Sequence, residues 1–402
     1  MMLPLHYITY IFLFCFVSVG CQDNNSKENT GINSAIDSIN PNLNKTIFTL
    51  KDSLQDDLAR YLSGLKQQHK TIYSPLESEN FWNAYAQRMD KAWFKMHDDR
   101  MNAIIEWDSI YFDEKVNDSL PLIYPFSGPD FLHAYYLFPK TKTYVLLALE
   151  QLNDLPALEK LNRDSRKLYF TSLENSLRDV MSKSYFITTH MGSDLHSERV
   201  KGVLPVLYFF IARSGLEIRQ AQQYVIDTAG NLVKSNWANT GKKIKVIKIT
   251  VRELSTETEK NIFYVSCNLS NTGLNFNTEV VKFIQKQGKC NTFIKAASYM
   301  PHYSTFKTIR DALIAQSDII FQDDTGFPYK YFKNRKNYDV TLFGRYAKPV
   351  KDFGNYVFQK DLDSVYKKDS TKITQLNFHL GYHWGDKKQA LLLIRKKNES
   401  EK

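Results

Sequence analysis

The segment Ser127-Gly128-Pro129-Asp130 follows an apolar run at residues 121–126 and precedes a helical pattern. α/β proteins usually place their ligand-binding groups in such a loop, directly after a buried strand. Asp130 is therefore a candidate catalytic acid, with Ser127 and His133 as further candidate catalytic residues. The same loop is also a complete helix start, with a polar cap, a proline in the first turn and an acid at the positive helix end.

Three residues of metal-binding types, His190, Asp194 and His196, lie within a span of seven residues. Imidazole and carboxylate groups bind zinc and harder divalent ions. One loop rarely supplies a complete ligand set, and two histidines in a polar loop are ordinary. We therefore expect no metal ion and no other cofactor, and keep these three residues as candidate ligands only.

Two further segments carry candidate ligand-binding residues. Asp323 and Asp324 begin the string Asp-Asp-Thr-Gly, which contains the aspartic-protease triplet in a single copy. Those enzymes need two such carboxylates that share a proton, so one copy favours an ordinary hairpin turn. His379 and His383 flank Gly381 in a stretch that we interpret as a strand. Side chains four residues apart on a strand stand about 13 Å apart and cannot share one ion, but the face around Gly381 is open to a ring or a glycan.

The N-terminus has the pattern of a lipoprotein signal. Residues 7–19 are apolar apart from a threonine and a serine, a length well short of the roughly 20 residues that a membrane-spanning helix needs. Small residues lead into Cys21, and a polar run follows at once, which resembles a bacterial lipobox of the Bacteroidetes type. We expect a signal peptide at 1–20, lipidation of Cys21 and anchoring in the cell envelope, with the outer membrane as the expected location. Simple secretion is the alternative.

Charge is distributed unevenly along the chain. The formal net charge is +10, yet residues 241–402 hold 29 basic and 16 acidic residues, so the excess lies in the C-terminal part. Such an excess fits either a solvated lysine-rich surface or a surface that meets an anionic glycan or lipid. No arginine-and-aromatic nucleic-acid module is visible, so we expect no nucleic-acid partner.

The two cysteines that remain outside the signal are Cys267 and Cys290. In an exported chain such a pair forms either one disulfide or two buried free thiols. Cys267 lies in an apolar strand pattern, which favours the free thiols.

Composition indicates a globular α/β protein, because 43% of the residues are hydrophobic and 24% are charged. Residues 21–46 read as a flexible tether, 47–119 as a helical subdomain and 120–215 as a strand-helix-strand and helical part. Residues 216–402 read as a mixed, mainly antiparallel sheet with flanking helices, with strands that include 327–332 and 376–384. The expected fold class is mixed α+β, with the helical subdomain preceding the sheet.

Three strings, at Tyr124–Leu132, Gln322–Pro328 and Gly381–Trp384, together resemble a family of exported bacterial proteins. The likeness spans most of residues 120–395. It implies one integrated α/β body and brings no activity or ligand with it.

Seven triplets of the chain have Asp followed by Ser or Thr and then a small aliphatic residue, Met or Thr. Composition predicts roughly one or two by chance. Exported proteins of Bacteroidetes resemble one another in carrying O-glycans on such triplets. Some of the triplets are also helix starts, so Ser38, Ser119 and Ser364 are the expected glycosylation sites.

Together these patterns favour a lipid-anchored envelope protein with a binding or structural role. The alternative is a hydrolase that acts on an envelope or extracellular polymer, with Asp130 as the essential acid. An enzyme should bring Asp130 together with a second polar group such as His133, His190 or Asp323 in a pocket. A binding module should have a shallow basic or aromatic surface instead.

Overall fold

The computed structural model describes residues 54–186, 200–241, 243–334, 336–350, 353–368, 370–383 and 389–397. The chain divides into Met1–Thr49 and Leu50–Lys402, and every described residue belongs to the second unit. Cys21, Ser38 and the three candidate metal ligands His190, Asp194 and His196 therefore lie outside the described residues.

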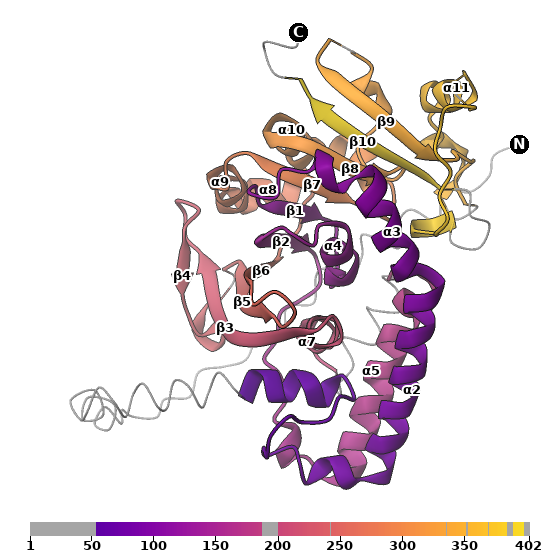
Figure 1. Cartoon of the computed structure of the whole chain (residues 1–402). Helices are drawn as coiled ribbons and strands as arrows, with labels where there is room; N and C mark the ends of the chain where they lie inside the picture. The colour runs from indigo at the N-terminus through magenta and orange to yellow at the C-terminus, as the bar shows by residue number, and fades with distance from the viewer. Residues whose placement is uncertain are drawn as a thin grey trace, which may run out of the picture. The chain divides into compact units, whose positions relative to one another are not determined.

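The strands of the described chain form one ten-stranded sheet in the order β4-β3-β5-β6-β2-β1-β7-β8-β10-β9 (Figure 1). Five neighbouring strands, β6, β2, β1, β7 and β8, run parallel to one another, and the strands on both sides of them pair antiparallel. The bounds are β1 (Leu122–Pro125), β2 (Thr143–Ala148), β3 (Leu216–Ile226), β4 (Leu232–Lys234), β5 (Lys245–Glu253), β6 (Glu259–Ser266), β7 (Cys290–Ile294), β8 (Ser317–Asp323), β9 (Tyr338–Gly344) and β10 (Ala390–Lys396).

Helices cover both faces of the sheet. A helix at residues 54–62 packs against one core together with α2 (Asn80–Met96), α3 (Asn102–Tyr111), α4 (Phe131–Leu137), α5 (Arg163–Lys183) and α7 (Leu204–Arg213). The other core holds side chains of α8 (Asn271–Phe276), α9 (Thr278–Lys286), α10 (Lys307–Gln316) and α11 (Lys360–Lys368).

The alternation of side chains along the parallel strands explains why there are two cores. On β2, Tyr144 and Leu146 enter the first core, whereas Val145 and Leu147 enter the second. Successive side chains of a strand point to opposite faces, so a continuous apolar run is what a strand buried on both faces requires. The first core also takes the buried face of α2, which includes Met89.

The mixed α+β fold class predicted from the sequence is confirmed. Helices precede and flank a mixed sheet, in which five of the nine pairings between the described strands are antiparallel. The two thiols Cys267 and Cys290 are buried and free, which confirms the favoured alternative.

Three local predictions are wrong. The Asp324-Thr325-Gly326 turn does not close a hairpin, because β10 lies between β8 and β9 and pairs with both. Residues 327–332 hold no strand but a short 3-10 helix, Tyr329–Phe332, since Pro328 has no N–H for a ladder. Residues 376–383 are not a strand either, because Gly381 has φ +72° and turns the chain.

Candidate functional site

The carboxyl ends of the parallel strands gather the candidate residues at one edge of the sheet. β1 continues through α4 to β2 on one side, whereas β7, its neighbour on the other side, continues through α10 to β8. The connections thus leave β1 and β7 in opposite directions, which makes their carboxyl ends a topological switch point. Open α/β sheets bind their ligands at such points.

Asp130 lies at this point and begins α4. Its side chain accepts a hydrogen bond from the backbone N–H of His133, so the predicted helix cap is present. The same carboxylate lies 2.7 Å from His133 Nδ1 and 2.7 Å from Lys295 Nζ, and it also accepts a hydrogen bond from the Tyr124 hydroxyl. Asp130, His133 and Lys295 are all buried, with side-chain exposures of at most 3%.

Burial and charge together set the protonation of these three groups. Burial lowers the pKa of His133 to about 3, so its imidazole is neutral at neutral pH. Burial alone would raise the pKa of Asp130, but the neighbouring His133 and Lys295 hold that pKa below its ordinary value. Because His133 is neutral, the positive charges that favour the ionised form of Asp130 are the Lys295 ammonium, in direct contact, and the more distant Arg100 guanidinium. Burial also lowers the pKa of Lys295, while Asp130 opposes that shift.

The imidazole of His133 is oriented by this arrangement. Its Nδ1 donates to Asp130, because an ionised carboxylate can only accept. Its Nε2 is buried and has no hydrogen-bond partner among the described residues. The Nε2 lone pair therefore lies inside the core, and His133 lines neither of the two cavities between α2 and α5.

Asp323 and Asp324, at the end of β8, lie beside the same edge. Asp323 accepts hydrogen bonds from the backbone N–H groups of Ala296 and Thr325, and Asp324 accepts one from the Tyr299 hydroxyl at 2.6 Å. Burial raises the pKa of Asp323, and burial together with the charge of Asp323 raises the pKa of Asp324 to about 7.

Described residues from the three strings at 124–132, 322–328 and 381–384 lie at this edge. Asp130 comes from the first string and Asp323 from the second, and Lys295 stands between them, with electrostatic effects from both. Gly381, from the third string, lies so close to Asp323 that a Cβ atom there would come within 2.7 Å of its Oδ2. Its neighbour Tyr382 donates from its hydroxyl to the Ala296 carbonyl.

We name Asp130, His133, Lys295 and Asp323 the carboxyl-edge cluster. Unusual backbone surrounds it. Six described residues other than glycine have positive φ, and five of them lie here: Phe126, Ser184, Ala296, Ser298 and Tyr299. Left-handed backbone costs energy for residues with a Cβ and concentrates at functional sites.

The remaining candidates do not join the cluster. The Ser127 hydroxyl is buried and donates to the Gly128 carbonyl. His379 lines a cavity beside α2, and His383 lies in a 3-10 turn. Within the described ranges, no three His, Cys, Asp or Glu side chains form a group that could hold a metal ion. Ser119 and Ser364 are both exposed.

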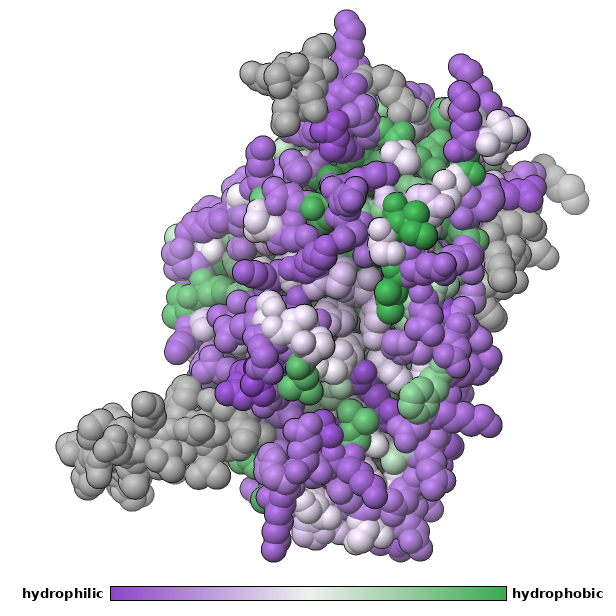
Figure 2. Space-filling view, in the orientation of Figure 1, coloured by the Kyte–Doolittle hydropathy of each residue, from purple (hydrophilic) through white to green (hydrophobic). Residues whose placement is uncertain are grey.

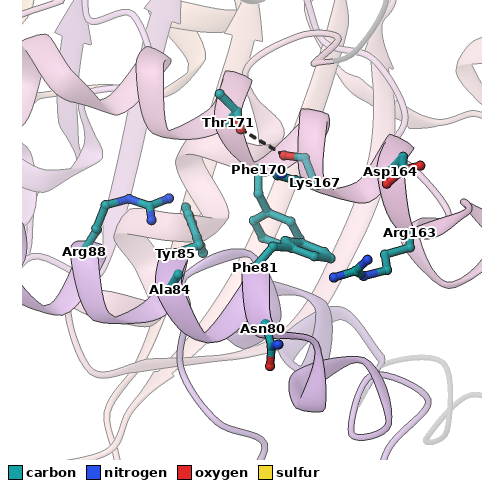
Figure 3. Close-up of a pocket in the computed structure, with 10 residues that line it drawn as sticks. All are labelled: Asn80, Phe81, Ala84, Tyr85, Arg88, Arg163, Asp164, Lys167, Phe170 and Thr171. Carbon is teal, nitrogen blue, oxygen red and sulfur yellow. Dashed lines mark hydrogen bonds between the residues drawn. The ribbon is translucent and has the colours of Figure 1, made fainter.

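Two cavities lie between α2 and α5. The smaller, of about 370 Å³, has a floor of Phe81, Tyr85 and Phe170 (Figure 3). In that view the rings of Phe81 and Phe170 meet at the centre, with Arg88 at one end and Arg163 at the other. We call it the aromatic hollow.

The larger cavity, of about 540 Å³, adjoins the aromatic hollow at Arg88. Its apolar floor comes from Met89 and Met96 of α2 and Met181 of α5, and we call it the methionine groove. The bidentate ion pair between Arg88 and Glu174, with both hydrogen bonds at 2.8 Å, stands between the two cavities.

Arg100 links the methionine groove to the carboxyl-edge cluster. It lines the groove although it is only 2% exposed. Burial lowers the pKa of Arg100 to about 10, and the charge of Asp130 opposes that shift. The groove and the cluster are therefore coupled electrostatically through one buried guanidinium.

Sequence reasoning missed Lys295 and Arg100. Lys295 follows β7, whose central residues Asn291 and Thr292 are polar yet fully buried, so no apolar strand pattern marks it. Arg100 lies one helical turn after Met96, the last residue of α2, and only its burial distinguishes it from the exposed cations nearby.

No protein-family model, no curated protein and no solved structure matches this chain. None of the helices in the described part is both long and apolar enough to cross a bilayer. The face drawn in Figure 2 is mostly hydrophilic, with hydrophobic side chains scattered over it.

Proposed function

We propose that the protein is a lipid-anchored protein of the cell envelope whose body binds a ligand. The anchor rests on the sequence: a short apolar segment, small residues before Cys21 and a polar run after it. The resemblance of three strings to exported bacterial proteins supports the same placement, with the outer membrane as the expected location. That those strings lie together at the carboxyl edge supports treating them as one site.

Membrane fractionation of the native host tests the anchor. The wild-type protein is expected to incorporate tritiated palmitate and to sediment with the outer membrane. The Cys21→Ser protein is expected to incorporate no palmitate label and to be absent from the membrane fraction. A Cys21→Ser protein that still partitions as a membrane protein contradicts the proposed anchor.

The binding role rests on one observation: the methionine groove combines an apolar floor with cationic walls and is coupled through Arg100 to a buried charged cluster. The volume of the cavity is within the range of small-molecule sites, and its twelve lining residues include three methionines and six charged residues. The groove is formed mainly by α2 and α5, and of the described residues that line it only His379 comes from the basic C-terminal part, which remains a second proposed surface for anionic glycans or lipids.

A second candidate function, hydrolysis of an envelope or extracellular polymer, is favoured by the pair of Asp130 and His133. In that reaction His133 Nε2 takes a proton from water, the water oxygen bonds to the electrophilic atom, and the leaving oxygen departs with the returned proton. Asp130 would hold the imidazole rather than supply the proton, because its pKa is lowered. Polymer hydrolysis by the wild type that is lost in His133→Gln favours this candidate, and equal product from both proteins excludes it.

A further inference from the structure

The walls of the methionine groove carry two cations that form no ion pair among the described residues, although the charges of Asp130 and Asp99 act on one of them, Arg100, from further away. Arg88 pairs with Glu174, and Lys95 pairs with Asp99 at 2.6 Å. Arg100 and Arg178 form no ion pair with any described carboxylate. Among the described residues, the guanidinium of Arg178 donates only to the amide oxygen of Asn175. The groove therefore has more positive charge than its own acids balance.

Arg100 is the more informative of the two cations, because burying a cation without a carboxylate at hydrogen-bond distance costs free energy. Its Nη2 donates to the backbone carbonyls of Val180, at 2.9 Å, and Met181, at 3.5 Å. Its Nε is buried and has no partner in the described structure. A guanidinium has five donors in a fixed fork, so the fork is left incompletely used. An anion in the groove would add a partner at the edge of the guanidinium that lines the groove.

The floor beside Arg100 is apolar and adaptable. Met89 and Met96 are buried, and Met181 is half-buried, so the three thioether side chains line the bottom of the groove. Methionine side chains are unbranched and fill irregular gaps, and they are over-used at surfaces that accept flexible apolar ligands. The neighbouring aromatic hollow extends this apolar floor along the same helix pair, past the ion pair of Arg88 and Glu174.

We propose that the methionine groove binds a single-chain amphiphile whose anionic head, a carboxylate or a phosphate, lies against Arg100 and whose alkyl chain lies on the methionines. This proposal rests on the proposed binding role and specifies its ligand. The head satisfies the Arg100 donors, with Arg178 at the rim as a second positive charge. The alkyl chain contacts the methionine side chains that line the groove, of which the half-buried Met181 is the most exposed.

Calorimetric titration of the full Cys21→Ser chain tests this, because that protein carries no acyl group of its own. The probes are sodium decanoate, decyl phosphate, decyl maltoside and inorganic phosphate, each used below its micelle concentration. Decanoate and decyl phosphate are expected to bind about tenfold or more tightly than decyl maltoside, because only they carry the charge. Inorganic phosphate, without a chain, is expected not to bind. Equal binding of the charged and neutral heads, or binding of phosphate alone, overturns the proposal.

Charge-removing variants locate the site. Arg100→Gln is expected to weaken decanoate binding about tenfold or more, and Arg178→Gln severalfold. Lys234→Gln removes an exposed charge from β4, outside the groove, and is expected to leave the affinity unchanged. If Arg100→Gln does not fold, Met181→Glu provides the second test, because it places a negative charge in the groove floor and should abolish binding. An affinity that responds to Lys234→Gln as strongly as to the groove variants refutes the assignment.

These experiments distinguish a failure of the proposed anchor from a failure of the proposed ligand site. A wild-type protein that carries no acyl group contradicts the proposed anchor but leaves the titration valid. A chain that binds no anionic amphiphile contradicts the groove assignment and leaves the fractionation result unchanged.

Discussion

Replacing Lys295 by methionine tests whether the carboxyl-edge cluster is held by one ion pair. The ammonium of Lys295 is 2.7 Å from the Asp130 carboxylate, and the two side chains are 1% and 3% exposed. Methionine keeps most of the stem and removes the charge, which leaves Asp130 as a buried anion beside a neutral His133. Removing one partner of a buried pair costs roughly 3–5 kcal/mol of unfolding free energy.

The comparison that isolates the pair is a double-mutant cycle with Asp130→Asn. Asparagine still caps α4, so the double variant has neither buried charge and is expected to lose less stability than the two single variants summed. We expect a coupling free energy of about 2 kcal/mol from urea unfolding at neutral pH. Lys260→Met is the matched control, because that buried ammonium has its nearest carboxylate, Glu253, at 3.7 Å. It should show a smaller coupling with Glu253→Gln.

The cost of Lys295→Met should also depend on pH. Wild-type Asp130 has a lowered pKa, so its ionised form contributes stability above the unfolded pKa, near 4, and loses it only as pH falls further. In Lys295→Met the Asp130 carboxyl can take up a proton as the pH is lowered, so the loss of unfolding free energy relative to the wild type should become smaller toward about pH 4. Additive single variants, or a deficit that does not change with pH, refute the ion-pair reasoning.

Four other predictions concern single positions or surfaces. Gly381→Ala should destabilise the protein by more than about 1–2 kcal/mol, the cost of left-handed backbone alone, because the alanine Cβ would also meet the Asp323 side chain. Gly215 has a similar φ and open space around it, so Gly215→Ala measures the backbone cost by itself in urea unfolding. Burial and the charge of Asp113 raise the pKa of Asp108 to about 7, so its protonated form stabilises the fold at low pH and that contribution is lost up to pH 7. Asp108→Asn should therefore gain roughly 1–3 kcal/mol over the wild type near pH 8 and little near pH 4, and equal gains at both pH values contradict this. Alkylation in denaturant without reductant should modify both Cys267 and Cys290, and unmodified cysteines would indicate a disulfide. Binding of a polyuronate to the basic C-terminal part should weaken steeply with added salt, whereas salt-independent binding would exclude a charged surface.

The parts of the fold that local sequence encodes could be predicted. Asp130 caps α4 and contacts His133 three residues later, so one turn of helix brings the pair together without tertiary information. The apolar runs of β1 and β2 were likewise readable, because both faces of these strands are buried.

The rest of the site depends on tertiary packing. Lys295 reaches Asp130 only because β7 pairs with β1, and the buried polar residues of β7 hide that strand from any hydrophobic pattern. The left-handed turn at Gly381 lies beside Asp323, which is distant in sequence. The local sequence around Gly381 therefore predicts a strand that the structure does not contain. The methionine groove arises where α2 lies beside α5, and no single segment contains both of its walls.

The central claim is that the methionine groove is a ligand site whose anion contact is Arg100. A crystal structure of the Cys21→Ser chain grown with sodium decanoate tests it most directly. We expect a carboxylate hydrogen-bonded to the Arg100 guanidinium and an alkyl chain in contact with Met89, Met96 and Met181. Decanoate bound elsewhere on the body, with Arg100 uncontacted in an empty groove, contradicts it.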